Sequence, residues 1–204
     1  MTNPLPISEA LGPYVLTRGG RAVYFLNPQA VDYAIEDIAY QLSRLRRFTG
    51  IGISVAQHSV LVMDRAIGQG AAPALQLAAL MHDAPEFVTG DLAAPFKKAL
   101  DLVVSGDGLR AIERKLEQAI AAAFGVPAAD EAGRSLVHTW DMEVRAAEVR
   151  DLFPPHLHSR FGALPKPWPD APITEWEAEE AEYEFLHRFN RLKLWLKAEA
   201  EFSV

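Results

Sequence analysis

Cysteine is absent from the 204-residue sequence, and positively charged side chains are scarce. Without cysteine there can be no disulfide bond, thiolate metal ligand or cysteine nucleophile, so any metal ion must be held by nitrogen and oxygen atoms. The chain has 20 Lys and Arg against 27 Asp and Glu, which gives a formal net charge of −7. Because phosphate backbones are held through many Lys and Arg contacts, this balance argues against a long nucleic acid as partner. It still allows a small anionic substrate.

Long hydrophobic runs are missing as well. The N-terminal segment MTNPLPISEA lacks a basic region followed by an apolar run, and no stretch approaches the roughly 20 apolar residues that cross a bilayer. We therefore expect a cytoplasmic protein with no membrane association. Hydrophobic residues still make up 50% of the chain, enough for one sizeable core, so a single domain is the simplest organisation.

Helical periodicity dominates most of the chain. From about Asp32, apolar residues recur three and four positions apart, as they do on one face of a helix. Similar patterns, bounded by capping residues, glycine or proline, predict further helices at about 54–67, 74–90, 110–124 and 134–153, and a last helix after residue 174. Proline predicts a turn at Pro95 and a long loop over residues 154–172.

The first 30 residues differ from the rest because they are rich in Pro and Gly. The alternating stretch 22–26, which follows the Gly19-Gly20 turn, predicts a strand or an extended arm. We therefore predict an all-α fold in which a short extended or β-hairpin arm, residues 1–30, precedes one helical domain, residues 31–204.

The most informative pattern is formed by histidine and aspartate. His58 is followed by the adjacent pair His82-Asp83, and Asp141 lies in a later helical segment. Imidazole and carboxylate together suit a borderline divalent metal ion. The stretch 74–81 is nearly all apolar, and burying a carboxylate beside an imidazole without a partner costs several kcal/mol. A metal ion would satisfy both side chains of the pair.

In outline, these residues predict a hydrolytic metal site, and two neighbouring features fit this prediction. Ser54 and Gln57 have the spacing of a capping box, which places His58 near the start of a helix. Glu86 follows His82 by one helical turn, so both would project from one face of a continuous helix. A carboxylate in that position can work next to a metal ion without being a ligand.

These residues resemble those of the HD superfamily of metal-dependent phosphohydrolases. The resemblance is closer to bacterial 5'-deoxynucleotidases and to a related prophage and phage group that includes dATP triphosphohydrolases. It spans most of the chain in family order, through the stretches 37–42, Arg47-Phe48, 54–59, 82–86, 89–95, 141–148, 150–152 and Trp176.

The resemblance implies an HD-type helical phosphohydrolase domain that holds one divalent metal ion (Co, Mn, Mg, Zn, Fe or Ni). The implied ligands are His58, His82, Asp83 and Asp141. Glu86 would be the general acid/base that orients the attacking water, and Asp91 a second carboxylate that assists it. Family precedent also implies a homo-oligomer, a dimer or a larger assembly.

The implied substrate is a nucleotide. Arg47 and Phe48 would contact it, although the deoxynucleotidases carry Arg-Trp where this chain has Arg47-Phe48. The expected reaction is phosphate release from deoxyribonucleoside 5'-monophosphates by water that the metal activates. A dNTP triphosphohydrolase of the dATP type could use the same site. An alternative from another class is a non-catalytic helical module that senses metal or nucleotide, against which the presence of Glu86 argues.

Overall fold

Two short antiparallel strands, β1 (Tyr14–Leu16) and β2 (Ala22–Tyr24), form a hairpin near the start of the chain. The chain reverses at Gly20, whose φ of 77° favours glycine and whose N–H donates to the Thr17 carbonyl. The structure is a computed structural model that describes residues 11–103 and 108–202. It confirms the predicted hairpin arm for residues 11–30; residues 1–10 of that arm lie outside the described residues.

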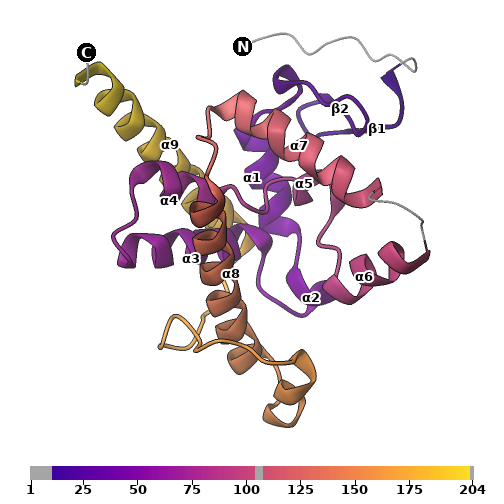
Figure 1. Ribbon diagram of the computed structural model, residues 1–204, viewed down its shortest axis with the longest axis vertical. Coiled ribbons are helices and arrows are strands. Elements are labelled where there is room, and N and C mark those ends of the chain that lie inside the picture. The colour runs from indigo at the N-terminus through magenta and orange to yellow at the C-terminus, as the bar shows by residue number, and fades with distance from the viewer. Residues whose placement is uncertain (1–10, 104–107, 203–204) are drawn as a thin grey trace.

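The rest of the described chain is mainly helical, which confirms the predicted all-α class (Figure 1). The helices are η2 (Ala30–Asp32), α1 (Ile35–Arg44), α2 (Arg47–Gly50), α3 (Val55–Gly68), α4 (Pro73–Leu80), α5 (Glu86–Thr89), α6 (Ala94–Val103), α7 (Gly108–Phe124), α8 (Glu131–Leu152), η3 (Pro155–Phe161) and α9 (Ala178–Phe202). None of those within the described ranges has the length and apolar character needed to span a membrane.

Helix α3 is the centre of the packing, because α1, α4, α8 and α9 all contact it. Its fully buried side chains include Val60, which belongs to the main core together with Leu42 of α1, Leu77 of α4 and Phe185 of α9. A second apolar cluster joins α3 and α4 to α8 around Trp140. Each fully buried large side chain stabilises the fold by about 1.5–3 kcal/mol. Side chains that α3 and α8 present to each other are therefore held firmly.

The helix predicted over residues 74–90 is not continuous. Helix α4 ends at Leu80, residues 81–85 form tight turns, and α5 begins at Glu86. Pro85 has no N–H, so it cannot donate to the carbonyl four residues earlier. Its neighbours form hydrogen bonds that span three residues instead of four, from the Ala84 N–H to the Met81 carbonyl and from the Glu86 N–H to the Asp83 carbonyl. The expectation that His82 and Glu86 share one helix face was therefore wrong.

Two other segments differ in part from expectation. The predicted turn at Pro95 is the first turn of α6, where proline is tolerated because its missing N–H would have no helical partner. The proline-rich segment 154–172 is a loop as predicted, except that it includes η3. In Figure 1, α8 runs down to η3 at one end of the long axis.

Candidate metal centre

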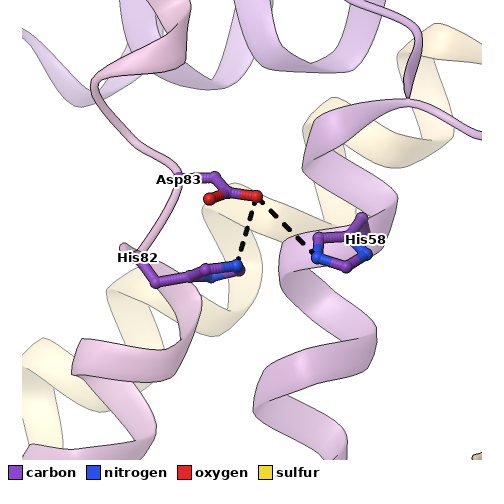
Figure 2. Close-up of side chains that lie close together, drawn as sticks. All are labelled: His58, His82 and Asp83. Carbon is purple, nitrogen blue, oxygen red and sulfur yellow. Dashed lines mark ion pairs between the residues drawn. The ribbon is translucent and has the colours of Figure 1, made fainter. Parts of the chain in front are cut away.

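His58, His82 and Asp83 come together from two segments, α3 and the turn after α4 (Figure 2). One potential ligand atom from each lies within 4.8 Å of the other two. Asp83 Oδ2 is 3.1 Å from His82 Nε2 and 3.8 Å from His58 Nε2. Asp141, from α8, joins them with its Oδ1 3.1 Å from His58 Nε2. His58, His82 and Asp83 thus form the group that could hold a metal ion, and Asp141 lies next to it against His58; we call these four residues the His–Asp cluster.

The position of His58 follows from the local sequence. Ser54 caps α3, and its hydroxyl accepts a hydrogen bond from the Gln57 N–H at 3.1 Å, as predicted. The Gln57 side chain does not complete the capping box. Instead it donates to the Thr174 carbonyl at 2.7 Å and accepts from the Trp176 N–H at 3.0 Å. The Ser54 cap places His58 in the first turns of α3, where its side chain is fully buried.

Both histidines turn the same nitrogen toward the cluster. His58 Nδ1 lies 3.1 Å from the buried carboxylate of Glu148, and His82 Nδ1 lies 2.8 Å from the Ala79 carbonyl. Because both of these oxygens accept hydrogen bonds, each Nδ1 carries a proton, and Nε2 is the nitrogen that offers a lone pair when the imidazole is neutral. Carboxylate or carbonyl partners on the far nitrogen are typical of histidines that ligate metals.

The two Nε2 atoms are buried and, among the described residues, have no hydrogen-bond partner. Each lies 3.1 Å from a carboxylate oxygen, so when the imidazoles are neutral the cluster consists of electron-pair donors directed at one another. Unpaired buried polar atoms are costly, and either a proton on Nε2 or a metal ion between these side chains would satisfy them. Two imidazoles and two carboxylates, without sulfur, suit a divalent ion such as Mn, Fe, Co, Ni or Zn. The residues present therefore fit a metal ion.

The charges of the cluster favour a cation at the same place. Burial alone would lower the pKa of His82, but the carboxylates of Asp83 and Asp141 and the Ala79 carbonyl together outweigh burial and raise this pKa to about 9. Burial would raise the pKa of Asp83, yet the His82 imidazole holds it well below its ordinary value. For Asp141, the His58 imidazole likewise outweighs burial and lowers the pKa. A metal ion would compete with protons for these atoms.

Arg47 is buried among carboxylates at the edge of the cluster. Its Nε lies 3.1 Å from Glu148 Oε1, its Nη1 3.3 Å from Asp83 Oδ2 and its Nη2 4.0 Å from Asp141 Oδ1. Only 10% of the side chain is exposed. These contacts position the two cluster carboxylates. The expected contact between Arg47 and a substrate phosphate stays a prediction, and Arg47 does line the pocket described below.

Phe48 and Thr49 adopt left-handed backbone conformations, with φ of 51° and 56°. Such conformations cost non-glycine residues about 1–3 kcal/mol each and persist where surrounding contacts impose them. One such contact comes from Asp91, whose Oδ2 accepts a hydrogen bond of 3.1 Å from the Phe48 N–H. The Phe48 ring meets Phe153 and Phe161 edge-on. Asp91, which was predicted to assist catalysis, therefore holds the backbone of Phe48 in place.

Gly52 allows this segment to fold tightly. A Cβ atom at Gly52 would lie 2.8 Å from the Phe48 ring and 2.9 Å from Arg47 Cβ. We expect Gly52→Ala to displace both residues and to lower the free energy of unfolding by about 1–3 kcal/mol. Urea unfolding measures this. The matched control is Gly68→Ala at the end of α3, where an added Cβ meets nothing within 4 Å. An equal effect of the two substitutions would contradict the prediction.

Glu86 is the first residue of α5, directly after the break at residues 81–85, and is half-buried. Burial and the neighbouring carboxylates of Asp83 and Asp91 raise the pKa of Glu86 to about 9. Its Oε2 is buried and lacks a hydrogen-bond partner among the residues that the structure describes. A bound divalent cation would offset the repulsion and lower this pKa. Glu86 is thus placed beside the cluster with an oxygen free to exchange a proton.

A pocket of about 730 Å³ opens beside the cluster, and we call it the cluster pocket. Its size suits a small molecule. Acidic, aromatic and basic side chains line it: Asp83, Glu86, Asp91 and Asp141; Phe48, Phe153 and Phe161; and Arg47, Lys97, Lys98, Arg145 and Arg160. A smaller, mainly apolar pocket of about 360 Å³ also reaches His82 and Asp141. All of the predicted catalytic and substrate-binding residues therefore line the cluster pocket.

Glu148, Arg145 and Arg160 are charged site residues that the sequence patterns did not single out, and the pocket phenylalanines Phe153 and Phe161 were not singled out either. Glu148 lies two helical turns after Asp141 on α8, so the two carboxylates share a helix face, and this spacing is a signal that could have identified it. Arg145 shares that face for the same reason. Arg160 has no comparable signal because it belongs to η3, inside a predicted loop.

No family model matches the chain. An uncharacterized protein of Rhodobacter capsulatus is 38% identical over 116 residues, which cover 53% of this chain and 57% of that protein. The uncharacterized protein YfdR of Escherichia coli is 32% identical over 142 residues, which cover 68% of this chain and 72% of YfdR. The match thus spans little more than half of the first relative and most of the second. Neither name states an activity.

Proposed function

We propose that this chain, which belongs to the same family as the uncharacterized protein YfdR, is an HD-type metal-dependent phosphohydrolase that acts on nucleotides. The observation that carries the proposal is the pair of buried Nε2 atoms of His58 and His82, which face the carboxylates of Asp83 and Asp141 without a hydrogen-bond partner in the described chain. Glu86 beside them adds a group that can transfer protons. The cluster pocket adds space and positive charge for a phosphate-bearing ligand.

The chemistry follows from these residues. A divalent ion in the cluster would supply Lewis-acid chemistry, which polarises a phosphoryl group and makes water more acidic. Glu86 accepts a proton from the attacking water as the new P–O bond forms. The same carboxyl group can then donate a proton to the leaving 5'-oxygen as the old P–O bond breaks. Arg47 keeps Asp83 and Asp141 in position while this happens.

Deoxyribonucleoside 5'-monophosphates are the first candidate substrates, and phosphate is then the product. A second candidate reaction cuts a dNTP into nucleoside and triphosphate at the same cluster. Additional basic residues in the cluster pocket, Lys98, Arg145 and Arg160, favour the second candidate, because one monophosphate at a divalent ion needs little further positive charge. A metal- or nucleotide-sensing module remains the alternative from another class.

Incubation with a nucleotide panel tests the proposal. We expect the purified chain to release phosphate or triphosphate from at least one deoxynucleotide with Co²⁺, Mn²⁺ or Mg²⁺, and to lose this activity in excess chelator. Chromatography of the products separates the two candidate reactions. As a control, His187→Asn changes a histidine on α9 that stacks on Tyr183, and it should retain full activity. If metal binds and no nucleotide is cut, the proposal is wrong.

We also propose a homo-oligomer, as expected from the sequence. Helix α9 supports it, because this helix exposes 70% of Leu194 and 49% of Trp195. Exposed large apolar side chains on one helix favour association with another protein surface.

A further inference from the structure

The arginines of the cluster pocket differ in how their charge is used. Arg47 is surrounded by the carboxylates of Glu148, Asp83 and Asp141. Arg145 and Arg160 line the same pocket, but the structure shows no ion pair or hydrogen bond for either within residues 11–103 and 108–202. Their positive charges are therefore available to a ligand, whereas that of Arg47 is already shared among protein groups.

Arg145 is placed to work next to the cluster. It follows Asp141 by four residues on α8, so both project from one helix face and into the same pocket. Arg145 is half-buried, which distinguishes it from an ordinary solvated surface arginine. A partly buried guanidinium that lacks an acidic partner binds phosphate oxygens well, because it can donate two parallel hydrogen bonds.

Arg160 reaches the pocket from a different segment. It lies on η3, which follows α8 at the end of the molecule and also carries Phe161 (Figure 1). Lys98 on α6 lines the pocket as well. Helices α8, η3 and α6 thus each place a positively charged side chain in the cluster pocket. This charge exceeds what one monophosphate at a divalent ion requires, and it matches a ligand that carries further phosphate groups.

We infer that Arg145 and Arg160 form an anion-binding subsite for the phosphate groups of a nucleotide that are not attacked. The inference rests on the proposed function, since it takes a nucleotide as the ligand. It assigns the substrate class more narrowly: nucleoside di- or triphosphates should bind in preference to monophosphates. Phe48, Phe153 and Phe161, which pack together in the same wall, offer an apolar surface for the uncharged part.

Calorimetric titration of the full chain with dAMP and with dATP tests the inference. The titration is done in excess chelator, where no turnover consumes the ligand, and circular dichroism checks that helix content is kept. We expect dATP to bind at least about 10-fold more tightly than dAMP, since a single hydrogen bond to a charged group is enough for a ratio of that size. Arg145→Gln should remove most of this preference and Arg160→Gln part of it. Arg145→Lys keeps the charge and should retain some preference.

Arg191→Gln is the matched control. Arg191 is exposed on α9 and lines another pocket, away from the cluster residues. It should leave the preference for dATP unchanged. Equal binding of dAMP and dATP by the unaltered chain would overturn the inference, as would an equal loss for both ligands in Arg145→Gln. If the nucleotide panel with metal shows hydrolysis of dAMP while the titration shows no preference for dATP, the subsite alone is overturned. If dATP binding depends on Arg145 in the titration and no nucleotide is cut in the panel with metal, only the proposed function is overturned.

Discussion

Glu148→Ala is expected to lower the free energy of unfolding by about 3–5 kcal/mol, because it leaves the buried Arg47 guanidinium without its main partner. Glu148 is fully buried and lies 3.1 Å from both Arg47 Nε and His58 Nδ1. Removing it therefore breaks two buried contacts at once. Urea unfolding monitored by circular dichroism measures the loss.

The same substitution should weaken metal binding. His58 would lose the partner that fixes its protonated nitrogen, and loss of such a partner typically lowers metal affinity by about 10–100-fold. Calorimetric titration with Co²⁺ or Mn²⁺ measures this, using Glu148→Gln if the alanine variant does not fold. Glu179→Ala is the matched control, since Glu179 pairs with Arg44 and is 79% exposed. Its removal should cost less than about 1 kcal/mol. Similar effects of the two alanine variants would contradict this assignment.

Glu86→Gln is expected to reduce nucleotide hydrolysis by about 10²–10⁴-fold while metal binding changes little. Glutamine has nearly the same shape as glutamate but cannot accept the proton of the attacking water. Glu86 is not among the four predicted metal ligands, so the metal should stay bound. Initial rates on the best substrate of the nucleotide panel, together with metal titration, measure both quantities.

This prediction also separates the enzyme from a sensing module. A sensor would bind metal and nucleotide equally well with either residue, and it would have no turnover to lose. Glu179→Gln provides a control, because Glu179 pairs with Arg44, is 79% exposed and is not among the residues that line the cluster pocket. If Glu86→Gln retained full activity, Glu86 would not be the general acid/base.

Most helices could be predicted because their signals are local. Apolar spacing on α1 and the Ser54 cap on α3 depend on residues a few positions apart, and the structure has both. The break at residues 81–85 was missed because the apolar run 74–81 suggested one continuous helix, although Pro85 changes the hydrogen bonds around it. Helix α6 was missed because Pro95 indicates a turn and a first helical turn equally well.

The residues of the His–Asp cluster could be named from type and spacing, whereas their partners could not. Glu148 contacts Arg47 across 101 positions of the chain and His58 across 90. No local pattern connects residues so far apart, and a buried glutamate looks in the sequence like a solvated one. The carboxylate partners of Arg47 could not be predicted either, because they come from distant segments. Its predicted contact with a substrate phosphate depends on these partners.

By itself the sequence determined the helical class, the β-hairpin arm and the types of side chain that could hold a metal ion, because these depend on local periodicity and on donor chemistry. Only the tertiary structure decided which nitrogen of each histidine faces the cluster, and which pocket arginine is held by carboxylates and which has no acidic partner in the described part of the chain. Those outcomes depend on burial and on contacts between distant segments. The free energy of an imidazole or a guanidinium is set by the groups that packing places around it.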